Sequence, residues 1–303
     1  GLAKMLHAAG FEVGVWLAPL LASESSDVYK AHPEWFVKGP TFGHLKIGTM
    51  HVLDPTHPQA AAHLGKVIKG IVGWGYTLLK IDFLFAGTWE GKRHKDVTGI
   101  EAYNTALKIM REAAGDKAML LAVGAPALPT IEHVDMWRVG GDIAVEPFKD
   151  PHFAFVANQL RMIASRWQFC RRVLCDADPA MLRAMPANEV NFGAWVVGLA
   201  GGGFFLSDDL RKLPDGRREW PFQLARDVAP ALSGQVTVPS STFPDKAPAT
   251  LVNAAFDHLE KKSRHVVPVV WPNPGGLIGA NVTDAPITAK GQAIPAHTII
   301  LLK

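Results

Sequence analysis

The segment TLLKIDF at residues 77–83 is a mostly apolar run that carries an acidic residue, Asp82, near its end. A helical stretch follows from about Thr98 to Ala114, and a second apolar run, AMLLAVG, occupies residues 118–124. Strands that are apolar along their length, rather than alternating with polar residues, are typical of a parallel sheet covered by helices. This strand–helix–strand unit therefore predicts an α/β fold with a parallel sheet.

The same alternation continues on both sides of this unit. We expect parallel strands at residues 14–19, 77–83, 118–124, 134–142, 171–178 and 202–208, and helices at residues 2–9, 57–72, 98–114, 152–169, 187–200 and 220–232. No Gly-x-Gly-x-x-Gly motif follows any of these strands, which argues against a dinucleotide-binding sheet. Charged residues instead follow several strands, as they do on the catalytic face of a (β/α)8 TIM barrel.

The two ends of the chain set the expected domain organisation. The chain opens with GLAKMLHAAGF, which reads as the middle of a helix, so we expect an N-terminally truncated barrel that supplies strands three to eight. From about Val236 a segment rich in Pro, Ser and Thr precedes short β-like runs at residues 250–256, 264–272, 277–283 and 297–302. We expect a barrel portion at residues 1–235 and a small antiparallel, β-sandwich-like domain at residues 236–303.

The composition excludes several classes of protein. Of 303 residues, 48% are hydrophobic and 19% are charged, which indicates a folded core rather than a disordered chain. The formal net charge is +3 and no block of Lys and Arg occurs, so we expect no nucleic-acid partner. The longest nearly apolar stretch, residues 192–206, is shorter than the ~18–20 residues of a membrane span, so we expect no membrane segment.

The two cysteines exclude further classes of protein. Cys170 and Cys175 are too few for a disulfide framework and lack the companions of a zinc site, so we expect two free thiols and no metal. Free cysteines favour the cytoplasm, although any targeting signal would lie upstream, and the localisation is therefore left open.

Lys80 and Asp82 form the first candidate site. Two residues apart on a strand, their side chains point to the same side of the sheet. An aspartate whose charged form is favoured by a neighbouring lysine suits a nucleophile. Two other interpretations stay open at this point: a salt-bridged pair that fills the barrel interior, and a lysine that forms a Schiff base with a carbonyl substrate.

A second cationic and acidic pair lies in MWRVGGD, which contains Arg138 and Asp142. One expected strand, AMLLAVG, separates this segment from the one that carries Asp82. Two carboxylates on barrel strands separated by one neighbour suit a retaining glycosidase, which needs its carboxyl groups ~5–5.5 Å apart. We interpret Asp176 and Asp178, in CDADPAM, as structural residues.

The runs KIDFLFAG, KIMREAAGDKAMLLAVGAPALP and VDMWRVGGDIA resemble glycoside hydrolase family 36, the α-galactosidase-like enzymes that share a clan with family 27. GFEVGVWLAP, HPEWFV, RVLCDADPAMLR and GGGFFLSDDLRKL fit the same family in the same order, so the resemblance covers residues 1–235. It implies a TIM barrel that cleaves terminal α-galactosides of oligosaccharides or other glycosides, with no cofactor. Relatives of this kind often associate, which leaves a homo-oligomer open.

The resemblance also implies roles for particular residues. Asp82 matches the family's nucleophile and Asp142 its acid/base residue. Lys80 and Arg138 match cations that hold sugar hydroxyls, and Trp16 matches an aromatic residue of the substrate site, although a core role for Trp16 is the alternative.

Two departures from the family pattern widen the set of functions. The family's acidic pair after the second strand has no counterpart, and the chain reads Ala122-Val123-Gly124 where close relatives carry a cysteine. The alternatives are therefore a related α-glycosidase or transglycosylase of different sugar specificity, or a degenerate barrel that binds sugar without catalysis.

Overall fold

The computed structural model describes residues 1–44, 48–144, 153–166, 168–213, 216–217, 219–220, 269–273 and 276–302. The chain divides into two compact units, Gly1–Trp137 and Arg138–Lys303, which are described separately below. The expected helix at 220–232 and the expected linker after Val236 lie almost wholly outside the described residues. No helix in the described ranges combines the length and apolar character needed to cross a bilayer.

The predicted parallel sheet is confirmed, with five strands. These are β1 (Gly14–Leu17), β5 (Leu78–Ile81), β6 (Met119–Ala122), β7 (Met136–Arg138) and β8 (Leu174–Asp176). They follow the order β1-β5-β6-β7-β8, with parallel pairing of β1 to β5, of β5 to β6 and of β6 to β7. Each strand is shorter than its expected run, and four of the five lose residues at both ends.

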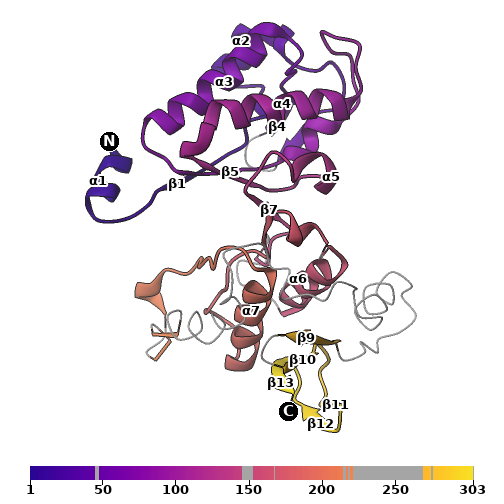
Figure 1. Ribbon diagram of the computed structural model, residues 1–303. Helices are drawn as coiled ribbons and strands as arrows, with labels where there is room; N and C mark the ends of the chain where they lie inside the picture. Colours follow the sequence, from indigo (N-terminus) through magenta and orange to yellow (C-terminus); the bar gives the residue numbers. More distant parts are fainter. Residues whose placement is uncertain are drawn as a thin grey trace. The chain divides into compact units, whose positions relative to one another are not determined.

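Five of the expected helices are present, and two further short helices, at residues 27–31 and 127–130, were not predicted from the sequence. The helices are α1 (Leu2–Ala8), α2 (Asp27–Ala31), α3 (Pro58–Gly73), α4 (Gly99–Ala114), α5 (Ala127–Thr130), α6 (Phe153–Arg166) and α7 (Ala187–Ala200). In the first unit α3 and α4 lie side by side (Figure 1). A capping box begins α4: the Thr98 hydroxyl accepts from the Glu101 amide, and the Glu101 carboxylate accepts from the Thr98 amide.

A small antiparallel sheet in the first unit was not predicted from the sequence. It contains β2 (Leu21–Ser23), β4 (Gly48–Val52) and β3 (Phe42–His44), in that order. Leu21 pairs with Val52, and Phe42 pairs with Met50. These strands follow β1 directly and carry few apolar residues, which is why the segment reads as a loop in the sequence.

The expected sixth parallel strand at residues 202–208 is wrong. Two isolated parallel bridges replace it, Cys175 with Gly201 and Ala180 with Leu206. The segment begins with two glycines, Gly202 and Gly203, and Gly201 precedes them; glycines weaken strands because they have no side chain to pack. A Cβ atom on Gly202 would also clash with the Cys175 carbonyl. The backbone therefore passes close to β8 without forming a regular ladder.

The expectation of two free thiols is also wrong, because Cys170 and Cys175 form a disulfide. The 3-10 helix Phe169–Arg171 lies between α6 and β8, and the two Cα atoms are 5.3 Å apart. This separation lies within the usual range for a disulfide. A count of two cysteines argues against a framework of several disulfides but not against one local bridge.

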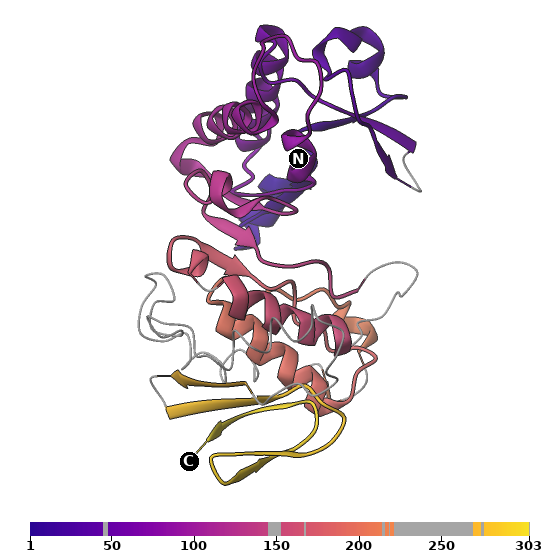
Figure 2. The same cartoon turned by 90° about the vertical axis from the view of Figure 1, so that its right-hand side faces the viewer.

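The predicted antiparallel strands near the C-terminus are present in the described residues of the second unit. β9 (Val269–Asn273), β10 (Gly276–Asn281) and β13 (Thr298–Leu302) form a sheet with β10 in the centre, and β11 (Ile287–Ala289) pairs with β12 (Gln292–Ile294). Figure 2 shows this sheet beside α6 and α7. The expected run at residues 250–256 lies outside the described residues.

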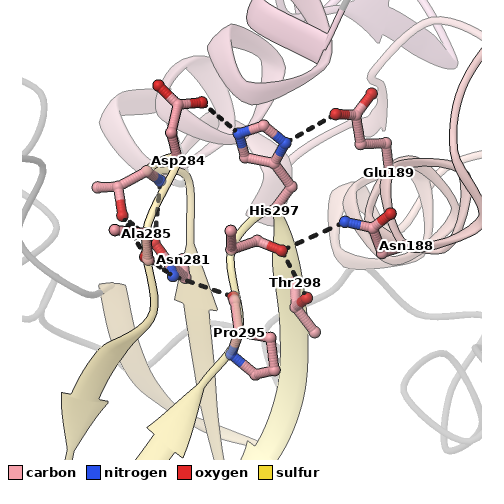
Figure 3. A network of polar contacts seen from close by, with 10 residues as sticks. Asn188, Glu189, Asn281, Asp284, Ala285, Pro295, His297 and Thr298 are labelled. Carbon is pink, nitrogen blue, oxygen red and sulfur yellow. Dashed lines mark hydrogen bonds and ion pairs between the residues drawn. The ribbon is translucent and has the colours of Figure 1, made fainter.

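A polar network fastens this C-terminal sheet to α7 (Figure 3). The His297 ring lies between two carboxylates, with Nδ1 2.7 Å from Glu189 Oε1 on α7 and Nε2 3.0 Å from Asp284 Oδ1. Its face stacks on Phe153 of α6, with ring centroids 3.8 Å apart. The Asn188 amide also donates to the Ala296 carbonyl. The sheet is therefore held by polar contacts as well as by its apolar side chains.

Candidate active site

Asp82 lies immediately after β5 in the first unit, and both of its carboxylate oxygens are held. Oδ1 accepts a hydrogen bond from the Phe83 amide at 2.6 Å, and Oδ2 accepts one from Trp16 Nε1 at 2.9 Å. Trp16 reaches Asp82 because β1 and β5 are parallel neighbours in which Trp16 pairs with Lys80. The structure therefore brings together two of the residues singled out in the sequence.

The chain turns sharply after Asp82. Phe83 adopts a left-handed conformation with φ 54° and ψ 31°, and a 3-10 helix, Leu84–Thr88, follows. A bulky residue rarely adopts positive φ, and such strained residues persist only where their surroundings fix them. In this turn the Phe83 amide donates to the carboxylate of Asp82. The strained backbone of Phe83 and the fixed orientation of Asp82 therefore belong to the same turn.

Aromatic rings surround this turn. The Phe42 ring, from β3, lies 5.2 Å from the Phe83 ring and 5.7 Å from the Phe85 ring, measured between centroids. The Trp16 ring meets the Phe83 ring edge-on at 6.1 Å, and Trp16 remains 49% exposed. Sequence reasoning missed Phe42 and Phe85, because Phe42 belongs to the small sheet that the sequence did not predict.

Lys80 has a different environment from the one expected for a salt-bridged pair. Among the described residues, Lys80 forms no hydrogen bond or ion pair, and none joins it to Asp82. Its side chain is partly buried. A cation on the same side of the strand as Asp82, without a protein partner in the described part of the chain, is available to a ligand.

Arg138 and Asp142 lie in the second unit, where Arg138 is the centre of a cluster of carboxylates. Arg138 is only 4% exposed. Its Nε donates to Asp176 Oδ2 at 2.9 Å, one terminal nitrogen donates to Asp142 Oδ1 at 2.9 Å, and the other lies 2.5 Å from Asp178 Oδ1. The expected pair of Arg138 and Asp142 is therefore part of a group of four residues, which we call the Arg138 cluster.

The three carboxylates of the Arg138 cluster differ in burial. The side chains of Asp176 and Asp178 are 2% and 9% exposed, whereas that of Asp142 is 61% exposed. A buried carboxylate is costly unless it is paired, and Arg138 supplies that pairing. The nearby carboxylates and hydrogen bonds raise the pKa of Arg138 despite the desolvation that opposes this rise. Only Asp142 is positioned to meet a ligand from solvent.

Backbone contacts hold the loop between Arg138 and Asp142. The Val139 amide donates to the Asp176 carbonyl at 2.9 Å, and the Ile143 amide donates to Asp178 Oδ2 at 2.8 Å. From α6, the Gln159 amide donates to the Gly141 carbonyl. A Cβ atom on Gly140 would clash with the Gln159 side chain, so the glycine permits this close approach.

Burial raises the pKa of Asp178 to about 6, with the charges of Asp142 and Asp176 adding to the rise and Arg138 and the Ile143 amide opposing it. Because this pKa exceeds the ordinary value of 3.8, the folded state binds the proton more tightly than the unfolded state. The resulting stabilisation is fully present below about pH 4 and is lost as the pH rises through about 6.

This sign gives a testable pH dependence. Relative to an Asp178→Asn variant, which does not titrate, the protein should lose stability between about pH 4 and pH 6, by on the order of 3 kcal/mol. Urea unfolding of both proteins at several pH values measures the difference. A difference that stays constant over this window would contradict the assigned titration.

Two cavities occur away from these carboxylates. One of about 610 Å³ lies between α3 and α4 and includes Lys66, Lys69 and Glu112. Another of about 400 Å³ is lined by residues of α6, of α7 and of the loops between the C-terminal strands, including Arg161 and His297. Within the described ranges, no group of three or more His, Cys, Asp or Glu side chains is arranged to hold a metal ion.

Comparison with known proteins gives this arrangement a family context. Residues 1–123 match the family model described as Melibiase. The curated α-galactosidase AgaA from Geobacillus stearothermophilus is 25% identical over 103 residues, which are 34% of this chain and 13% of AgaA. The N-terminal part of the chain is therefore similar to α-galactosidases.

Solved structures of family 36 α-galactosidases and of other α-galactosidases share the fold. TtGalA, the α-galactosidase from Thermus thermophilus solved in complex with stachyose, matches with a TM-score of 0.63 and 24% identity, over 74% of this chain and 51% of TtGalA. The family 36 enzyme AgaA matches with a TM-score of 0.55 and 12% identity, over 94% of this chain and 37% of AgaA. The chain thus spans about half the length of TtGalA.

Proposed function

We propose that the protein is a retaining glycoside hydrolase that cleaves terminal α-galactosides by double displacement. The observation that carries the proposal is the fixed carboxylate of Asp82. It follows a strand of a parallel sheet, and the Phe83 amide and the Trp16 indole hold its two oxygens. A nucleophile must face the reacting carbon in one orientation, and two hydrogen bonds from rigid elements supply that restraint.

In the proposed mechanism, Asp82 attacks the anomeric carbon as the glycosidic bond breaks, while Asp142 gives its proton to the leaving oxygen. Asp142 then takes a proton from water, whose oxygen attacks the same carbon and releases Asp82. Each attack inverts the anomeric carbon, so the configuration is retained overall. The exposure of the Asp142 side chain, 61%, supports a role that requires contact with both substrate and water.

We propose Trp16, Lys80 and Arg138 as residues that bind substrate. The half-exposed indole of Trp16 offers a face on which a sugar ring can stack, while its N–H stays on Asp82. Lys80 suits a sugar hydroxyl because its ammonium group has no partner among the described residues. Arg138 has only a small exposed fraction, so its direct contact with sugar would be limited to one edge of the guanidinium.

We further propose that the five-stranded sheet belongs to a (β/α)8 barrel, with residues 1–235 as its barrel portion and residues 236–303 as a small C-terminal β domain. The strand order and the fold of TtGalA support the barrel. The antiparallel pairing of β9, β10 and β13 supports the second part. Terminal α-galactosyl oligosaccharides are the proposed substrates, because TtGalA was solved in complex with stachyose.

The experiment compares hydrolysis of 4-nitrophenyl α-galactoside and stachyose by the longest natural form of the protein. We expect galactose to be released from both, initially as the α-anomer when the reaction is followed by NMR. Asp142→Asn should lower kcat/KM for stachyose by roughly 10²–10⁴-fold, the usual contribution of a general acid. The loss should be much smaller for the nitrophenyl substrate, whose leaving group needs no proton.

Asp116→Asn is the matched control, because Asp116 is an exposed carboxylate outside the proposed site. It should leave both rates unchanged. Unchanged hydrolysis of stachyose by Asp142→Asn would contradict the proposed acid/base residue. Binding of galactosides without any turnover by the wild-type protein would favour a degenerate, sugar-binding barrel.

A further inference from the structure

The Arg138 cluster restrains Asp142 through a single contact. Among the described residues, Arg138 is the only side chain that binds the Asp142 carboxylate. Each of the three guanidinium nitrogens serves a different carboxylate, and the planar group cannot turn toward one without losing another. The direction in which Arg138 presents its N–H to Asp142 is therefore set by its two buried partners, Asp176 and Asp178.

Asp178 holds the same loop at a second point. Its Oδ1 faces the Arg138 guanidinium, while its Oδ2 accepts from the amide of Ile143, the residue that follows Asp142. One carboxylate thus restrains both the side chain that binds Asp142 and the peptide on which Asp142 is carried. Asp176 supports it from the strand, because Asp176 Oδ1 accepts from the Asp178 amide at 2.9 Å.

The backbone of Asp178 has an unusual conformation that is consistent with its two contacts. Asp178 has φ 68°, in the left-handed region that a residue with a side chain adopts at some cost. Aspartate tolerates this region better than most residues. Asp178 lies two residues after β8, and its carboxylate contacts Arg138 of β7 and the Ile143 amide. Strain of this kind persists only when the surrounding contacts fix it, as Arg138 and Ile143 do here.

We propose that Asp178 is a positioning residue for Asp142: through Arg138 and the Ile143 amide it fixes the carboxyl group that transfers the proton in the proposed glycosidase reaction. This inference rests on the proposed function. It assigns Asp178 a role in proton donation to the leaving group, although Asp178 itself is buried and does not touch substrate. Asp176 contributes to the same positioning, because it accepts from Arg138 and from the Asp178 amide.

The chemistry predicts which substrates depend on Asp178. A leaving oxygen of low basicity departs without a proton, whereas a sugar alkoxide requires one from a correctly placed acid. A misplaced acid therefore slows hydrolysis of stachyose and hardly affects hydrolysis of 4-nitrophenyl α-galactoside. A general loss of structure would instead lower both rates by the same factor.

Asp178→Asn is the variant of choice. An asparagine offers one acceptor oxygen and turns an NH₂ group toward the second donor, so it must lose either Arg138 or the Ile143 amide. We expect kcat/KM for stachyose to fall by about 10²-fold, the scale of a misplaced catalytic group, and kcat/KM for the nitrophenyl substrate to change by less than about threefold. Asp116→Asn is again the matched control.

Circular dichroism and thermal unfolding establish that each variant is folded. If Asp178→Asn does not fold, Asp178→Glu takes its place, since the longer side chain displaces Arg138 while keeping the charge. In the Asp142→Asn background, the Asp178 substitution should have no further selective effect. Equal losses for both substrates, or no loss in a folded variant, would overturn the inference.

The two proposals fail in different ways. If Asp142→Asn shows the selective loss and folded Asp178→Asn does not, only the positioning role is wrong. If Asp142→Asn keeps its activity on stachyose, or the wild-type protein hydrolyses neither substrate, the proposed function itself is wrong.

Discussion

Replacing Asp82 with glycine should reduce hydrolysis of 4-nitrophenyl α-galactoside by roughly 10⁴-fold or more, the scale reported by removal of a covalent nucleophile. Azide should restore part of the rate, because the small anion enters the space left by the carboxylate and attacks the anomeric carbon. A single displacement inverts that carbon, so the product should be β-galactosyl azide. NMR of the product measures the configuration, and the rate follows from release of nitrophenol.

Trp16 and Phe83 supply a matched comparison for this experiment, because both donate to Asp82. Trp16→Phe keeps an aromatic ring and removes the N–H, so its activity should fall less than that of Asp82→Gly and should not respond to azide. Asp116→Asn should remain fully active. An Asp82→Gly protein that keeps its activity, or that forms the α-azide, would contradict a role for Asp82 as nucleophile.

Replacing Arg138 with methionine should lower the free energy of unfolding by about 3–5 kcal/mol, the cost of leaving buried charges without their partner. Arg138 pairs with Asp176 and Asp178, whose side chains are 2% and 9% exposed. Methionine fills a similar length of the buried space but offers no donor to either carboxylate. Urea unfolding at pH 7 measures the loss.

Arg211→Met is the control for this prediction. Arg211 also pairs with an aspartate, Asp209, but its side chain is 89% exposed. Exposed ion pairs contribute little to stability, so its unfolding midpoint should hardly move. Adding Asp176→Asn to the Arg138→Met variant should recover part of the stability, because one uncompensated charge is removed. Equal losses for Arg138→Met and Arg211→Met would refute the structural importance of the Arg138 cluster.

The parallel sheet could be predicted because its signal is local. Runs such as 77–83 and 118–124 are apolar along their length, and helices of clear periodicity lie between them. The sixth strand failed for an equally local reason: its glycines allow the backbone to approach Cys175 so closely that regular pairing is replaced by isolated bridges. The hydrophobic pattern thus predicts whether a segment is a helix or a strand, but not whether a strand forms a continuous ladder of hydrogen bonds.

Of the two pairs singled out in the sequence, Arg138 and Asp142 are in contact, whereas no contact among the described residues joins Lys80 to Asp82. Spacing on a strand and family resemblance picked out Asp82 with Lys80, and Asp142 with Arg138. Neither reveals that Trp16 donates to Asp82, because that contact depends on the neighbouring positions of β1 and β5. Asp176 was interpreted as structural, and its contact with Arg138 follows only from β8 lying beside β7.

One feature of the site ties its rings to its backbone. Phe83 takes a left-handed conformation that glycine would adopt at less cost, yet its ring contacts Trp16 and Phe42. A glycine there would relieve the backbone and also remove the packing that keeps the turn in place. Phe83 therefore keeps a strained backbone in exchange for ring contacts that hold the turn. If selection for thermal stability alone replaced Phe83 with glycine, we would expect the carboxylate of Asp82 to be held less firmly.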